Sequence, residues 1–131
     1  MDPRNLKKGF TLIELIVVVA IIGIMSAVGI LAYTGYADAA EKTKAQLSLN
    51  SISLAQSEYR SNNGEYYGTP ACSAATTTAI VNVLFEGVDN LSEQDYNFCV
   101  TATTPLLEME ATNGACVLTL DENNVSTEAG C

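Results

Sequence analysis

The stretch KKGFTLIELIVVVAIIGIMSAVGILAY, residues 7–33, places two lysines and a glycine ahead of a long apolar run. From Leu15 to Tyr33 the run has 19 residues, and Ser26 is its one clearly polar side chain. This length and composition predict a helix that crosses a bilayer. The basic residues in front predict a cytoplasmic start and a translocated C-terminal part. A secretory signal peptide is not expected, because the small residue Gly9 precedes the apolar run instead of following it.

The rest of the chain is acidic and contains all four cysteines. Downstream of Gly9 there are 14 acidic and three basic side chains, in a chain of 131 residues with net charge −9. Because phosphate contacts need clustered Lys and Arg, a general nucleic-acid-binding surface is not expected. An even number of cysteines behind a membrane span favours two disulfides and an oxidising compartment over four free thiols. The cysteines are Cys72, Cys99, Cys116 and Cys131.

The segment KKGFTLIEL, residues 7–15, resembles the processing site and mature N-terminus of type IV pilins and the related pseudopilins. In that family a membrane peptidase, the prepilin peptidase, cuts a short basic leader after a glycine, and the new N-terminal residue is methylated on its nitrogen. The resemblance implies that residues 1–9 are the leader, that cleavage falls between Gly9 and Phe10, and that Phe10 is N-methylated. It also implies that Glu14 is the glutamate that the family keeps at this place.

The charge of Glu14 needs a physical reason, because a carboxylate within hydrocarbon costs about 2.5 kcal/mol or more. The amine freed at Phe10 is a cation, and a neighbouring subunit offset along the helix axis could present it at the same depth. We therefore predict that Glu14 pairs with the Phe10 amine of another copy and sets the register of assembly. The alternatives are a carboxyl that is protonated in the membrane, and a side chain that snorkels to the interface.

One long helix with two halves is predicted. Residues 10–35 form the half that spans the membrane and later the filament core, and here Gly23 and Gly29 are candidate helix-loosening positions, with close packing in lipid as the alternative. Residues 36–62 form an amphipathic half, which Ser61–Gly64 ends. Its apolar stripe has the 4-3-4-3 spacing of a helix face and consists of Ala45, Leu49, Ile52, Gln56 and Tyr59.

The head, residues 63–131, is predicted to complete an α+β fold of the pilin type. A connecting loop comes first, and its apolar stretch 79–85 suits either a short helix or a strand. About three antiparallel strands then begin near Tyr96 and pack on the amphipathic half of the helix. Asn113 and Gly114 predict the two-residue turn of a hairpin between the last two of them.

The chain ends in NNVSTEAGC, residues 123–131, which we expect to be a loop pinned by a disulfide. Four cysteines allow three pairings. A bridge between Cys116 and Cys131 would tie this loop to the last strand, as pilins often do, and Cys72–Cys99 would tie the connecting loop to the first strand. The competing bridge is Cys99–Cys116, across adjacent strands. Each bridge would add about 2–4 kcal/mol to a small domain.

Catalytic chemistry is not expected. The sequence contains no histidine to activate a serine or cysteine, so no catalytic residue, enzyme activity or cofactor is predicted. Asp121–Asn124 could donate oxygens to Ca²⁺, but without an EF-hand pattern no metal is predicted.

The function that the resemblance implies is structural: a pilin that polymerises into an extracellular type IV pilus. Its partners would be copies of itself, the prepilin peptidase, the assembly platform of the inner membrane, and the membrane before assembly. The head would be periplasmic first and then exposed on the cell surface, where such filaments serve adhesion or twitching motility. The alternatives are a pseudopilin of a type II secretion system and a minor tip pilin with a binding role.

Overall fold

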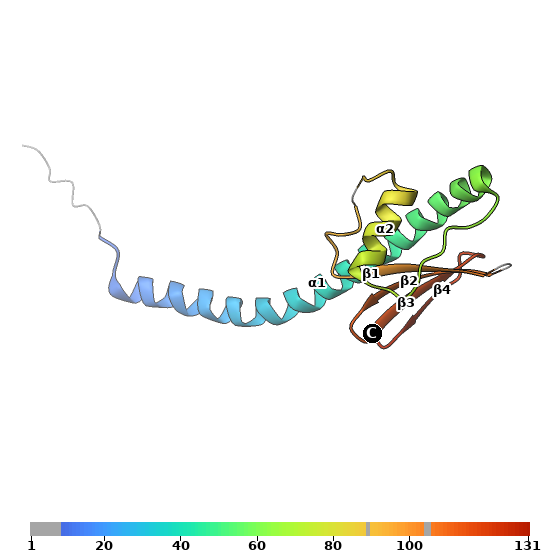
Figure 1. Ribbon diagram of the computed structural model, residues 1–131. Helices are drawn as coiled ribbons and strands as arrows, with labels where there is room; N and C mark the ends of the chain where they lie inside the picture. The colour runs from blue at the N-terminus through green and yellow to red at the C-terminus, as the bar shows by residue number, and fades with distance from the viewer. Residues whose placement is uncertain (1–8, 89, 104–105) are drawn as a thin grey trace, which may run out of the picture. The chain divides into compact units, whose positions relative to one another are not determined.

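The computed structural model describes residues 9–88, 90–103 and 106–131. Within these residues, two helices, α1 (Leu12–Asn63) and α2 (Ala74–Leu84), precede four strands, which are β1 (Asn97–Thr103), β2 (Leu106–Asn113), β3 (Cys116–Asp121) and β4 (Ser126–Ala129) (Figure 1). The chain divides into two compact units, unit 1 (Met1–Asp38) and unit 2 (Ala39–Cys131). The predicted α+β class, a long N-terminal helix with a small antiparallel sheet, is confirmed.

The long helix α1 ends close to the place that the sequence predicts. It runs to Asn63, and the next residue, Gly64, adopts φ 82°. The Gly64 amide donates a hydrogen bond of 2.8 Å to the Arg60 carbonyl. A glycine in the left-handed region is the usual way to close a helix, because it has no Cβ to clash there. The SNNG stop signal therefore acts as the sequence predicts.

The core of unit 2 lies between the helices and one face of the sheet (Figure 1). The predicted stripe of α1 supplies buried Ala45, Leu49, Ile52 and Gln56, while Tyr59 is half-buried. Alternate residues of the strands meet this stripe, since successive side chains of a strand point to opposite faces. The largest fully buried apolar side chains of the cluster are Phe98, Leu49, Ile52, Ile80, Leu91, Met109, Leu118 and Val100.

The stretch 79–85, which the sequence left open between helix and strand, lies largely in α2. Ser73 caps this helix: its hydroxyl accepts from the Thr76 amide at 3.2 Å, and its own amide donates to Thr76 Oγ1 at 2.8 Å. Thr76 and Thr77 then bond the backbone of Phe98 on β1. These contacts cover the outer edge of β1.

The sheet is an antiparallel meander in the order β1-β2-β3-β4. The β2–β3 turn differs by one residue from the predicted one, because Asn113 pairs with Cys116 and the turn consists of Gly114 and Ala115. Gly114 has φ 58°, so the glycine stands at the first turn position, where type II′ turns favour it. Pro105, which interrupts the β-rich run that begins at Tyr96 and thereby predicts the end of the first strand, lies outside the described residues, as does Thr104.

The terminal segment is not the plain loop that the sequence predicts, because it contains β4, and the sheet has four strands instead of about three. All four residues of β4 are exposed, so the strand lacks the alternation of buried and exposed positions that would predict it. It is held by pairing with β3, by the Cys116–Cys131 bridge, and by an ion pair of 2.7 Å between Lys42 and Glu128.

Candidate functional site at the start of the long helix

Thr11 and Glu14 form a reciprocal cap at the start of α1. The Thr11 amide donates to Glu14 Oε2 at 2.9 Å, and the Thr11 hydroxyl donates to the same oxygen at 2.7 Å. In return, the Glu14 amide donates to Thr11 Oγ1 at 3.4 Å. This is a capping box, in which two backbone donors that the helix leaves unpaired are satisfied by side chains. The negative charge also suits the positive end of the helix dipole.

The capping role of Glu14 is not among the predictions from the sequence. The signal was available, because T-L-I-E is the pattern of a threonine followed three residues later by a glutamate, directly before an apolar run. The cap uses Oε2 alone among the described contacts, so Oε1 remains able to accept a bond from another donor. The cap and the predicted pairing with a second copy are therefore compatible.

Around the cap, the surface of unit 1 is apolar. A shallow groove of about 370 Å³ is lined by Phe10, Ile13, Glu14, Val17 and Val18. The side chain of Phe10 is 81% exposed, and Glu14 is the one charged group in the lining. Unit 1 thus presents an apolar helix surface with a carboxylate in its first turn.

The apolar part of α1 meets the requirements for a membrane span. Its most apolar 18-residue window has a mean hydropathy of 2.9, and none of that window is buried within the chain. A core helix of a soluble domain would bury such a window, so these residues need lipid or other chains to cover them.

Gly23 and Gly29 lie inside α1, which is continuous through both. A Cβ added at either position would meet no atom within 4 Å. A single chain thus has no steric need for glycine here, and their effect on the helix in an assembly stays a prediction. Of the predicted leader, Gly9 is described and exposed, while residues 1–8 lie outside the described residues.

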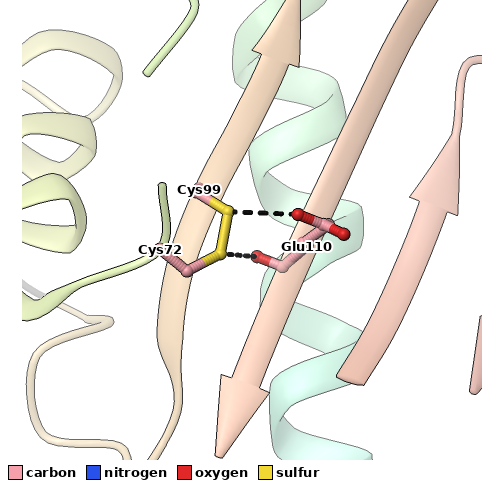
Figure 2. Close-up of side chains that lie close together, drawn as sticks. All are labelled: Cys72, Cys99 and Glu110. Atoms are coloured by element: carbon pink, nitrogen blue, oxygen red, sulfur yellow. Dashed lines mark hydrogen bonds between the residues drawn. A yellow bond between two sulfur atoms is a disulfide. The ribbon is translucent and has the colours of Figure 1, made fainter. Parts of the chain in front are cut away.

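In unit 2 the cysteines are joined in the pairs that the sequence analysis favoured, Cys72–Cys99 and Cys116–Cys131. One bridge lies beside a carboxylate: ligand atoms of Cys72, Cys99 and Glu110 are all within 4.8 Å of one another (Figure 2). Because the two sulfurs are bonded to each other, neither is a thiolate that could bind a metal ion in this state.

The Asp121–Asn124 stretch, whose oxygens could be ligands of Ca²⁺, forms hydrogen bonds within a turn. The Asp121 carboxylate accepts from the backbone amides of Asn123 at 2.9 Å and Val125 at 2.8 Å. These bonds close the turn between β3 and β4.

The chain is similar to known proteins in the region of this site. Residues 4–30 match the family described as the prokaryotic N-terminal methylation motif. The resemblance to the type IV pilins is confirmed. The similar proteins include a fimbrial protein of Neisseria meningitidis serogroup B, 40% identical over 76 residues, which are 58% of this chain and 45% of the relative. The fimbrial protein EcpC of Eikenella corrodens is 37% identical over 100 residues, 76% of this chain and 64% of the relative.

A third relative, the type IV major pilin protein PilA of Myxococcus xanthus, is 38% identical over 65 residues, 50% of this chain and 29% of the relative. The chain thus spans less than two thirds of the length of each of these relatives. All three relatives are described as fimbrial or pilin proteins.

Proposed function

We propose that this chain is the structural subunit of an extracellular type IV pilus, and that it polymerises through α1 after cleavage between Gly9 and Phe10. The observation that carries the proposal is an apolar 18-residue window of α1 that is 0% buried within its own chain, in a chain whose residues 4–30 match the N-terminal methylation motif. Lipid would cover this window before assembly, and the same helices of other copies would cover it in the fibre.

Glu14 gives the assembly its register in this proposal. Moving the helix from lipid into the fibre gains little hydrophobic energy, because lipid tails are as apolar as its side chains. Packing and polar contacts must therefore supply the difference. The amine of a cleaved and methylated Phe10 would bond the free Oε1 of a neighbouring Glu14, while Oε2 keeps its own helix capped.

The second half of α1 would add contacts between copies. Its inner stripe packs on the core of unit 2, but Leu47 and Leu54 are 63% and 74% exposed. The acidic surface of unit 2 would face water, which fits a filament subunit that leaves the inner membrane through the assembly platform. Adhesion or twitching motility would then be properties of the filament.

The experiment is to shear surface fibres from the source cells and to determine the mass of their subunit. A chain that begins at an N-methylated Phe10 and makes up most of a long fibre is the expected result. Recovery of the cut, methylated chain from the cell envelope alone would instead indicate a pseudopilin. Its presence in fibres as a trace component would indicate a minor tip pilin, and an uncut chain would overturn the processing step.

A further inference from the structure

The Cys72–Cys99 disulfide lies directly against two oxygens of Glu110 (Figure 2). Cys99 on β1 and Glu110 on β2 are register partners, so their side chains share one face of the sheet. Glu110 Oε2 is 3.5 Å from Cys99 Sγ, and the Glu110 carbonyl oxygen is 3.9 Å from Cys72 Sγ. Sulfurs joined in a disulfide have no proton to donate, so these oxygens act as negative neighbours of the bond.

The two cysteines of this bridge differ in their exposure to solvent. Cys99 is 2% exposed, whereas Cys72, in the loop before α2, is half-buried. An external thiolate can therefore reach the Cys72 sulfur more readily than the Cys99 sulfur. Attack at Cys72 makes Cys99 the leaving group, and the departing thiolate forms 3.5 Å from a carboxylate oxygen. Two like charges at this separation in a partly buried site repel each other, which slows the step.

The Cys116–Cys131 bridge differs, because its leaving sulfur lies beside a hydrogen-bond donor instead of a carboxylate. Cys131 is exposed, so attack there expels the thiolate of Cys116. The Tyr96 hydroxyl is 3.4 Å from Cys116 Sγ and can donate a hydrogen bond to that thiolate as it forms. One leaving sulfur thus faces a negative acceptor, and the other faces a donor.

We propose that thiol exchange at the Cys72–Cys99 bridge proceeds by attack at Cys72, and that Glu110 slows this step and selects against anionic thiols. In the first step a thiolate RS⁻ forms a new S–S bond to Cys72 while the Cys72–Cys99 bond breaks and its electron pair leaves on Cys99. A second RS⁻ then attacks the mixed disulfide, gives RSSR, and releases Cys72 as a thiolate. The reductant is the small thiol, which is oxidised as the disulfide is reduced. Glu110 acts through the negative charge of its carboxylate and does not contact the attacking thiol.

The test follows the reduction of both bridges in the full chain in detergent, at one pH and low salt. The thiols are anionic 2-mercaptoethanesulfonate and cationic cysteamine, with alkylation and mass spectrometry to count open bridges. In the native chain Cys116–Cys131 should open first. Glu110→Gln should speed the opening of Cys72–Cys99 by roughly threefold to tenfold with the anionic thiol and less with the cationic one.

Glu108 provides the matched control, because it is exposed on the same strand two residues away and has a register partner other than Cys99. Glu108→Gln removes the same charge and should change the Cys72–Cys99 rate by less than Glu110→Gln does. Equal rates in native and Glu110→Gln chains would overturn the proposal. Equal acceleration of both bridges in Glu110→Gln would also overturn it, since that result indicates a loosened head in place of a local charge effect.

Discussion

The two units of this chain contain different parts of α1, and the apolar side chains are exposed in one part and buried in the other. In unit 1 the large apolar side chains of α1 are exposed, with Leu12 at 75% and Ile24 at 68%. In unit 2 the same helix buries Leu49 and Ile52 almost completely against its own sheet. The first half must therefore be stabilised by lipid or by other copies, whereas the second half is stabilised within the chain. Substitutions in the two halves should accordingly have different kinds of effect.

The largest expected difference between the units comes from a pair of phenylalanines. Phe98 is 0% exposed in the core of unit 2, and Phe10 is 81% exposed in unit 1. Phe98→Ala should lower the free energy of unfolding of unit 2 by about 3–5 kcal/mol, because it removes a large side chain and leaves a cavity. Urea unfolding of the full chain in detergent, followed by near-ultraviolet circular dichroism of the tyrosines, measures this loss.

Phe10→Ala is the control for that measurement and should leave the unfolding midpoint of unit 2 unchanged. A similar loss of stability in both variants would contradict the separation of the two units.

A smaller effect is expected from Gln56, the polar member of the buried stripe. Its amide nitrogen donates to the Tyr67 carbonyl at 2.7 Å, and its oxygen accepts from the Tyr67 amide at 2.9 Å. Gln56→Ala would leave both backbone groups without these partners, so a loss of about 2–3 kcal/mol is expected in the same urea titration. Asn50→Ala, at an exposed position of α1, should cost far less. If Gln56→Ala lowers the free energy of unfolding no more than Asn50→Ala does, the two Gln56 hydrogen bonds contribute little to stability.

The smallest expected effect lies at the cap in unit 1. Thr11→Ala removes the hydroxyl of the capping box and should cost about 1 kcal/mol locally, seen as roughly fivefold faster amide hydrogen exchange in the first turn of α1 in micelles. Thr11→Ser keeps a hydroxyl and should exchange like the native chain. Unit 2 should be unaffected in both. An unchanged first turn in Thr11→Ala would mean that the cap does not stabilise the helix.

The sequence predicted the features that rest on long or regular patterns. The apolar run of residues 15–33, the stripe through Leu49 and Ile52, and the stop before Gly64 each follow from several residues that agree. The misses rest on a few residues. The exposed strand β4 has no apolar alternation, and the turn at Gly114 moved by one residue because Asn113 stays paired with Cys116.

The candidate site was predicted only in part, because some of its contacts also depend on a few residues. Phe10 and Glu14 were identified through a resemblance, and this directed attention to contacts between copies. The capping box between Thr11 and Glu14 is a local contact within one chain, and its four-residue pattern was overlooked. The position of Glu110 beside a disulfide depends on the register of β1 against β2, for which the sequence analysis predicted no turn.

The central claim is that the charge of Glu14 pairs with the amine of a neighbouring copy, beyond its role in the cap. Glu14→Gln separates the two roles, because glutamine also serves in a capping box but carries no charge. The measurement is the mass of sheared fibres per cell, with membrane levels of the subunit determined in parallel. We expect native membrane levels and a native first turn of α1 in Glu14→Gln, with fibres strongly reduced, as in Glu14→Ala. Fibres at the native level in Glu14→Gln would contradict this claim and would leave the cap as the sole role of Glu14.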